Sequence, residues 1–166
     1  MIGPDLRQRR EFLHGVGPFA DCSKGELRKV EPLTSLHEAE RGAALTEQGA
    51  VGREFFVIVD GAAAVWRNGV VIDELSSGSF FGELALLGRG DRTATVVADT
   101  DMTLVVLSER EFRTLPTVAP SVVTRMVVEL GTRLRRAIEL AGTATLPAGR
   151  RASLQAFCRS GQATPG

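Results

Sequence analysis

The chain of 166 residues has 20 basic and 20 acidic side chains, so its formal net charge is zero. Hydrophobic residues make up 43% of the chain and charged residues 24%, which is typical of one globular domain with its own core. A chain without net charge has no overall field that attracts nucleic acid or an anionic membrane, so any anion-binding site must be local.

Two features of the sequence favour a cytoplasmic protein. The cysteines, Cys22 and Cys158, form neither a CxxC motif nor a disulfide framework, which fits a reducing compartment. Residues 1–10 are charged and lack the apolar stretch of a signal peptide, and no uninterrupted apolar run approaches the ~18 residues of a membrane span.

Residues 5–31 are predicted to form short helices. Ser23 is followed three residues later by Glu26, which is the capping-box signature of a helix start. We therefore expect a group of N-terminal helices that leads into the strands of the domain.

Between residues 43 and 107 the chain consists of short segments rich in Val, Phe, Ile and Thr, separated by turn residues. Asn68-Gly69 is the clearest hairpin signal, because this pair suits a type I′ turn. Residues 93–97 and 102–107 are predicted to form another strand pair. Short strands at this spacing predict a sandwich or a barrel. Corners are expected at Gln48-Gly49, Asp60-Gly61 and Ser77-Gly78.

Helices are predicted again after the strands. Ser108 and Glu111 form a second capping box, which opens a short helix to about Leu115, where Pro116 interrupts it. A long helix is expected from Pro120 to about Ala141. It has apolar residues at the i, i+3, i+4 spacing of an amphipathic helix, namely Val123, Met126, Val127, Leu130, Leu134, Ala137, Ile138 and Ala141.

One segment among the strands differs from its surroundings. Residues 82–87 contain no β-branched side chain and are predicted to form a helical turn. The free amides at the start of such a turn favour an anion, and Gly82 lets the backbone approach it closely. Arg92 could pair with the same anion, because a guanidinium matches a phosphate bidentately, and Thr93 adds a hydroxyl.

Glu83 extends this chemistry to a second group. An ionised carboxylate only accepts hydrogen bonds, so beside a phosphate it would need a donor, such as a ribose hydroxyl. One phosphate and one adjacent ribose hydroxyl suggest a nucleotide with a single phosphodiester. The residues alone leave an alternative open, in which Glu83 and Arg92 form a surface ion pair worth ~0–1 kcal/mol. The leucines of the segment would then simply belong to the core.

A resemblance to a known family rests on two runs, Phe81-Gly82-Glu83-Leu84-Ala85-Leu86-Leu87 and Arg92-Thr93-Ala94-Thr95-Val96. Together they resemble the phosphate-binding cassette of the cyclic nucleotide-binding domain family, with the same spacing from glutamate to arginine. That family includes the catabolite activator protein, regulatory subunits of the cyclic AMP-dependent kinase and cyclic nucleotide-gated channels. The similarity covers about residues 10–140 and includes Phe56-Val57-Ile58-Val59-Asp60-Gly61.

The resemblance implies a mainly β fold with flanking helices. We expect an eight-stranded β-roll of the jelly-roll type, with N-terminal helices, a phosphate-binding cassette helix and a long C-terminal helix. The implied domain is residues 1–141, with helices at about 5–31, the roll at about 43–107 and helices at about 108–141, followed by a flexible tail at 142–166.

The resemblance also implies a role for each site residue. Glu83 would accept a hydrogen bond from the ribose 2′-hydroxyl, and Arg92 would pair with the exocyclic phosphate oxygens. Thr93 would contact the phosphate or the base. Backbone amides facing the cyclic phosphate would come from Gly82, Glu83, Leu84 and Ala85, and the pocket would be lined by Phe80 and Ile72.

Cyclic AMP is favoured over cyclic GMP as the ligand, although Thr93 is compatible with either base. Residues 134–139 of the long helix offer no obvious polar reader of the base, so Arg133 or Arg136 or apolar contacts would have to serve. The expected function is a stand-alone sensor or regulatory module that signals through movement of the long helix. The alternative is an interaction scaffold or dimerisation module with an empty or structural cassette.

Other classes of function are not expected. His14 and His37 are the only histidines and lack further ligands at metal spacing, and the sequence suggests no catalytic constellation, so neither a metal site nor an enzyme is predicted. The 25 residues after Ala141 are too few for a DNA-reading helical domain. Partners are therefore expected to be the nucleotide and either another protein or a second copy, through the long helix.

Arg150-Arg151-Ala152-Ser153-Leu154 resembles a kinase site, but chance explains it better in an arginine-rich stretch.

Overall fold

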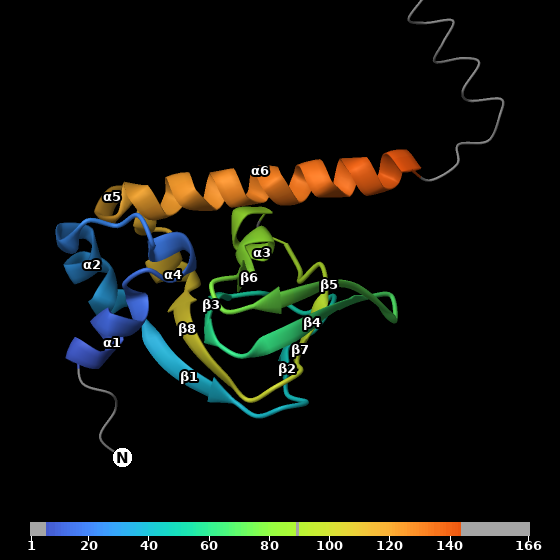
Figure 1. Ribbon diagram of the computed structural model, residues 1–166, viewed down its shortest axis with the longest axis horizontal. Coiled ribbons are helices and arrows are strands. Elements are labelled where there is room, and N and C mark those ends of the chain that lie inside the picture. Colours follow the sequence, from blue (N-terminus) through green and yellow to red (C-terminus); the bar gives the residue numbers. More distant parts are fainter. Residues whose placement is uncertain (1–5, 89, 144–166) are drawn as a thin grey trace, which may run out of the picture. The chain divides into compact units, whose positions relative to one another are not determined.

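The computed structural model describes residues 6–88 and 90–143 of the chain (Figure 1). It divides into two compact units, residues 1–127 and residues 128–166. The first unit holds all the strands of the described chain together with the short helices, and the second holds the distal part of the last helix, α6 (Pro120–Thr143).

Eight antiparallel strands form two four-stranded sheets in the first unit, which confirms the expected β-roll. One sheet has the order β1 (Ser35–Ala39), β8 (Met102–Ser108), β3 (Glu54–Asp60) and β6 (Phe80–Phe81). The other has the order β2 (Ala44–Thr46), β7 (Thr95–Ala98), β4 (Ala62–Arg67) and β5 (Val70–Ser76).

The side chains of β3 alternate between two apolar layers, because successive residues of a strand point to opposite faces. Phe56 and Ile58 belong to a buried cluster that joins the two sheets. Phe55, by contrast, packs its ring 5.1 Å from that of Phe112, in a helix. Both faces of β3 are therefore covered, which explains its nearly continuous apolar sequence. The inner cluster consists of Phe56, Ile58, Ala63, Leu75, Phe81, Val96, Ala98, Met102, Leu104 and Val106.

The hairpin between β4 and β5 has the predicted turn. Arg67 pairs with Val70, and the two residues between them have positive φ angles, 52° at Asn68 and 78° at Gly69. Positive φ at both central positions is the requirement of a type I′ turn. The expected corners at Gly49, Gly61 and Gly78 also have positive φ.

The predicted pairing of residues 93–97 with residues 102–107 is wrong. β7 pairs with β2 and β4, whereas β8 pairs with β1 and β3, so the connection between them passes from one sheet to the other. Ala62 fixes this corner, since its carbonyl accepts a hydrogen bond from the Asp99 amide at 2.9 Å and its amide donates to Thr100 Oγ1 at 3.0 Å. The composition of the two segments identified both strands but carried no information about their partners.

The strands also begin earlier than residue 43, because β1 spans Ser35–Ala39. β1 lies at the edge of its sheet and none of its five residues is buried, so it has little of the apolar signal by which the other strands were found.

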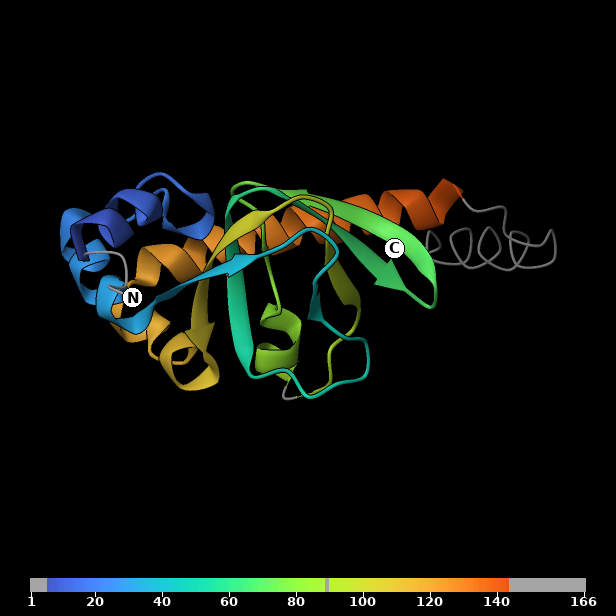
Figure 2. The same ribbon diagram turned by 90° about the horizontal axis from the view of Figure 1, so that it is seen from below.

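Apart from α3, the short helices of the first unit lie together at one end of the strands in both views (Figures 1 and 2). The two capping boxes, Ser23 with Glu26 and Ser108 with Glu111, are confirmed. Pro116 does not end a helix as predicted but lies in the first turn of α5, where its missing N–H is not needed. The helices are α1 (Leu6–Leu13), η1 (Gly17–Phe19), α2 (Lys24–Val30), η2 (Glu31–Leu33), α3 (Glu83–Gly88), α4 (Glu109–Phe112), α5 (Leu115–Val118) and the start of α6.

The expected long helix is present as α6, which spans Pro120–Thr143 within the described residues. Residues 144–166 of the expected tail lie outside the described residues. Among the helices that are described, none combines the length and the apolar character needed to cross a membrane.

Glu26 connects the N-terminal helices to the start of α6. Its carboxylate accepts hydrogen bonds from the amide and hydroxyl of Ser23, at 2.8 and 2.9 Å, and from the amide and hydroxyl of Ser121, both at 3.0 Å. The carboxylate thus caps two helices at once. The backbone hydrogen bonds from Ser121 and Ser23 lower the pKa of Glu26 to about 2.

We expect Glu26→Gln to lower the free energy of unfolding by about 0.3–1 kcal/mol at pH 7, because the amide keeps one acceptor oxygen but loses the charge that favours the helix N-termini. Because the folded-state pKa lies below the ordinary value of 4.5, the ionised form stabilises the fold above that value, and this contribution is lost as the pH falls from about 4.5 to about 2. Denaturant unfolding at several pH values measures both effects. Glu47→Gln, at an exposed glutamate, is the control, and coincident pH profiles for wild type and Glu26→Gln would contradict the role.

Candidate functional site

Gly82 connects β6 to the six-residue helix α3, which occupies the predicted position among the strands. Its φ angle of +88° lies in the left-handed region, which favours glycine. A Cβ at this position would lie 2.6 Å from Arg92 Nη1 and 2.7 Å from the Glu54 carbonyl oxygen. Both the backbone conformation and the surrounding contacts therefore require glycine here.

Arg92 is buried, with 7% of its surface exposed. Its Nη1 donates to the Gly82 carbonyl at 3.0 Å and its Nη2 to the Glu54 carbonyl at 2.9 Å. The guanidinium carbon lies 5.6 Å from the centre of the Phe56 ring, within the range of a cation–π contact. These contacts hold the cation between the start of β3 and the connection from β6 to α3.

Glu83, the first residue of α3, is also buried, with 3% exposure. Burial lowers the pKa of Arg92, and the carboxylates of Glu54 and Glu83 partly offset this effect by favouring the charged guanidinium. Since Glu83 and Arg92 are both buried, they do not form the solvent-exposed ion pair of the alternative interpretation. A buried cation with carboxylates close by is the kind of arrangement found at functional sites.

The other predicted residues of the segment differ in exposure. Ala85 is buried, whereas Leu84 has 51% of its surface exposed. Thr93 follows Arg92 and is exposed. The structure thus brings Gly82, Glu83 and Arg92 together, with Ala85 beneath them.

Two other predicted residues, Phe80 and Ile72, lie in other parts of the domain. The Phe80 ring lies 5.7 Å from that of Phe55, in the layer between the sheet and the helices. Its neighbour Phe81 points to the opposite face of β6 and stacks on Phe56 at 4.8 Å, beside the Arg92 guanidinium. Ile72 lies on β5, at the edge of the other sheet, and is 56% exposed.

Three residues around Arg92 were not predicted as part of the site. Glu54 contributes its backbone carbonyl, which any residue could supply, so its identity carries no signal. Phe56 was recognised only as part of a strand. Gly52 is buried beside Arg92 and Ala85, and it had no turn signal of its own.

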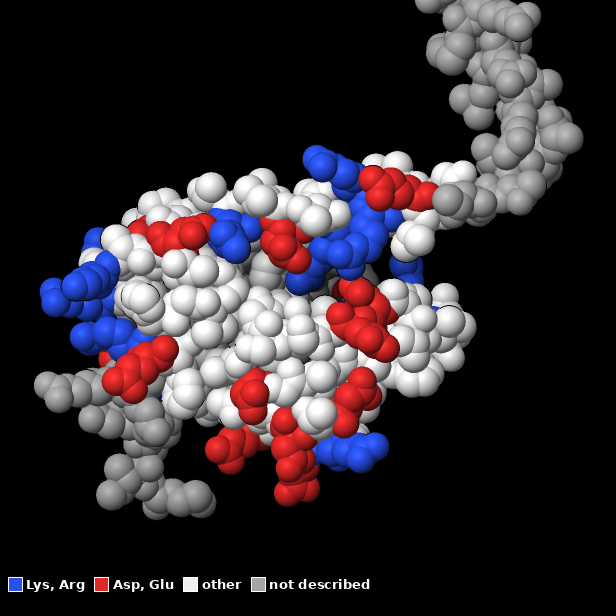
Figure 3. Space-filling view, viewed as in Figure 1, with Lys and Arg blue, Asp and Glu red and all other residues white. Residues whose placement is uncertain are grey.

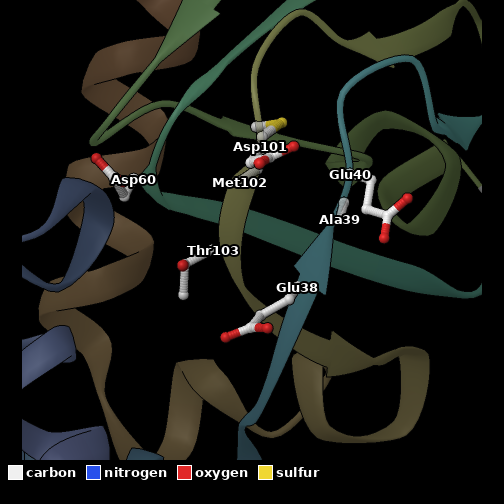
Figure 4. A pocket seen from close by; sticks show the side chains of 7 residues that line it. All are labelled: Glu38, Ala39, Glu40, Asp60, Asp101, Met102 and Thr103. Atoms are coloured by element: carbon white, nitrogen blue, oxygen red, sulfur yellow. The ribbon is translucent and has the colours of Figure 1, made fainter.

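A separate pocket of about 460 Å³ lies where β1 and β3 end and β8 begins (Figure 4). Glu54, which accepts a hydrogen bond from Arg92, lies at the opposite end of β3. In Figure 3, acidic side chains gather at the lower edge of the molecule, where β1 ends in the same view in Figure 1. Repulsion by these carboxylates disfavours a phosphate there. Among the described residues, no group of three or more His, Cys, Asp or Glu could hold a metal ion. The pocket is lined by Glu38, Ala39, Glu40, Asp60, Asp101, Met102 and Thr103.

The fold is a β-roll with a buried cation, Arg92, beside the start of α3. Residues 36–116 match the family model described as the cyclic nucleotide-binding domain. This stretch includes every strand except the first residue of β1, and it contains the whole Arg92 site. Residues 36–116 therefore form a domain of the cyclic nucleotide-binding domain family.

Similar proteins agree with this assignment. The chain is 40% identical over 114 residues to a cAMP-dependent protein kinase regulatory subunit of Mycosarcoma maydis, in a match that covers 63% of this chain and 22% of that relative. The chain therefore spans less than a quarter of that relative's length.

Two solved structures are similar in fold. One, described as Sp-2Cl-cAMPS bound to PKAR CBD2, has a TM-score of 0.68 and 25% identity, and the match covers 86% of this chain and 97% of that chain. The other, a cyclic nucleotide-binding domain from Methylobacillus flagellatus, has a TM-score of 0.72 and 22% identity, with 88% and 89% covered.

We expect Gly82→Ala to lower the free energy of unfolding more than Gly42→Ala does. Gly42 has nearly the same φ, +89°, but nothing lies within 4 Å of a Cβ there, so its alanine variant pays only the backbone strain of about 1–2 kcal/mol. Gly82→Ala adds the contacts with Arg92 and Glu54. Denaturant unfolding of the two variants separates these effects. Equal losses of unfolding free energy would mean that Arg92 and the Glu54 carbonyl move away from the added Cβ at no cost in stability.

Proposed function

We propose that this domain binds a cyclic nucleotide at the Arg92 site, with cyclic AMP preferred over cyclic GMP, as a sensor or regulatory module in the cytoplasm. The observation that carries the proposal is the buried Arg92 guanidinium, held beside Gly82 and the buried Glu83 within a segment that matches the family. The relatives named as cAMP-dependent regulatory subunits favour cyclic AMP.

Each group of the site has a role in this proposal. The amides of residues 82–85 face the cyclic phosphate, and Arg92 pairs with its exocyclic oxygens through donors that the two carbonyls do not engage. Glu83 accepts a hydrogen bond from the ribose 2′-hydroxyl, and Thr93 contacts the phosphate or the base. Phe80 is left out, because its ring packs between the sheet and the helices. Ile72 stays a prediction for the base end of the pocket.

The proposed protein is a binding module and not an enzyme. The relatives are named as regulatory subunits. Cys22 is a poor nucleophile, because burial, with Glu26 and Asp21 nearby, raises the pKa of its thiol to about 11. DNA is not expected to be a partner, and the output of ligand binding is proposed to pass through α6.

Isothermal titration calorimetry with cyclic AMP and cyclic GMP tests the ligand. We expect wild type to bind cyclic AMP more tightly, and Arg92→Ala to lose ~10–100-fold in affinity, as for a lost charge-assisted hydrogen bond. Arg53→Ala, at an exposed arginine near the site in sequence, is the control and should bind like wild type. The absence of binding heat with either nucleotide at millimolar concentration would refute the proposal.

A second candidate, a dimerisation module, is favoured by the apolar residues of α6. Met126 is buried, so it belongs to the core and is not available to a partner. Further along, large apolar side chains are exposed, namely Val127, Val128, Leu134, Ile138 and Leu140. Exposed apolar residues on one helix can mark an interaction surface.

Sedimentation velocity with and without cyclic AMP tests this candidate. We expect wild type to dimerise in a concentration-dependent manner and the double variant Leu134→Asp/Ile138→Asp to remain monomeric, because charges on an apolar interface are not tolerated. A wild type that is monomeric at every concentration would exclude self-association through α6 and leave a different protein as the receiver.

A further inference from the structure

The segment before β3 runs alongside Arg92 and is bonded to it through the backbone. The Arg92 amide donates to the Ala50 carbonyl at 2.7 Å, and the Gly49 amide donates to the Arg92 carbonyl at 2.8 Å. Val51 and Asp91 form an isolated antiparallel bridge beside these bonds. The backbone of Arg92 is therefore fixed against residues 49–51, and its side chain extends past the next residue, Gly52.

Gly52 is buried, and the space that its side chain would take is already occupied. A Cβ on Gly52 would lie 2.6 Å from Ala85 Cβ, 2.7 Å from Arg92 Nε and 2.8 Å from Arg92 Cδ. Contacts below 3.0 Å essentially do not occur between a Cβ and other heavy atoms, so these neighbours would have to move. Ala85 belongs to α3 and cannot yield without a shift of that helix.

The need for glycine at this position comes from contact and not from backbone conformation. Gly52 is absent from the glycines with positive φ, so alanine there would not suffer the strain of a left-handed backbone. This distinguishes Gly52 from Gly82, where the φ of +88° alone disfavours any other residue.

We propose that Gly52 is a positioning residue of the cyclic nucleotide site. The absence of its side chain leaves a slot in which the Arg92 stem lies against Ala85, so that the guanidinium reaches the carbonyls of Gly82 and Glu54. A side chain at residue 52 would move Arg92 and α3 together, and these supply the cation and the amides of the proposed phosphate site. The predicted effect of Gly52 on nucleotide binding rests on the proposed function, whereas its predicted effect on the position of the Arg92 side chain does not.

Calorimetric titration of cyclic AMP into Gly52→Ala and Gly90→Ala tests the proposal. Gly90 is the matched control, since it also lacks a positive φ and lies near Arg92 in sequence, and a Cβ added there would meet no atom closer than 4.0 Å. We expect about tenfold or greater loss of affinity for Gly52→Ala, comparable to removal of a charge-assisted hydrogen bond, and a change of less than about twofold for Gly90→Ala. Wild-type affinity in Gly52→Ala would overturn the proposal.

A double-mutant cycle with Arg92→Ala shows whether Gly52 acts through the guanidinium. If it does, Gly52→Ala should cost clearly less affinity in the Arg92→Ala background than in wild type, because coupled residues are not additive. A full additional loss in the Arg92→Ala background would overturn the proposal, since it would mean that Gly52 acts independently of Arg92.

The variant Gly52→Ala/Ala85→Gly separates the two contacts. It removes the Cβ of Ala85 but keeps the two contacts with Arg92. We expect it to regain stability in denaturant unfolding while its affinity for cyclic AMP stays low. Recovery of both would show that Gly52 supports only α3, and would overturn its role in positioning Arg92.

NMR of the arginine side chains in the ligand-free protein needs no nucleotide. The Arg92 signals, assigned by their loss in Arg92→Lys, should show slow hydrogen exchange in wild type, because both Nη groups donate to carbonyls, and faster exchange in Gly52→Ala. Unchanged signals in Gly52→Ala would overturn the proposal. If wild type binds neither cyclic nucleotide, the proposed function fails, and this measurement still decides the role of Gly52.

Discussion

The burial of one guanidinium organises this domain. A buried cation is costly unless hydrogen bonds and nearby negative charge compensate for its lost hydration. Arg92 receives that compensation from the Glu54 and Gly82 carbonyls, from the Phe56 ring and from nearby carboxylates. These groups come from β3 and from the segment at the start of α3, whereas Arg92 itself precedes β7, so a single charge holds three distant parts of the sequence together. A chain without net charge thereby holds a local, buried positive charge.

The parts of the fold that could be predicted from the sequence are those that depend on nearby residues. The capping boxes at Ser23 and Ser108 and the turn at Asn68-Gly69 were identified because their hydrogen bonds or backbone angles involve only a few neighbouring residues. The partners of β7 and β8 were not, because pairing depends on which sheet each strand joins. β1 was missed because an edge strand without buried residues lacks an apolar pattern.

The residues of the site also differ in whether the sequence could predict them. Glu83 and Arg92 were found from side-chain chemistry and spacing, and the structure buries both. The Glu54 carbonyl and the empty space at Gly52 leave no such trace, because one is backbone and the other is the absence of an atom. The choice between Phe80 and Phe81 depends on strand register, since a shift of one residue exchanges the two faces. Phe81 faces the layer that contains Phe56, and Phe80 faces the helices.

The connections of α6 limit how a ligand at Arg92 could act on it. Within the first unit, Glu26 caps α2 and the first turn of α6, Arg125 pairs with Asp21 at 2.9 Å, and Val122 is fully buried. The exposed Arg125–Asp21 pair adds little stability, so the shared cap and the buried side chain are what join these helices. A ligand shifts a conformational equilibrium only as far as it binds one arrangement better than the other. Any movement of the start of α6 must therefore either move α2 as well or break the hydrogen bonds of Glu26. If those hydrogen bonds break, the binding energy of the ligand has to compensate for their loss.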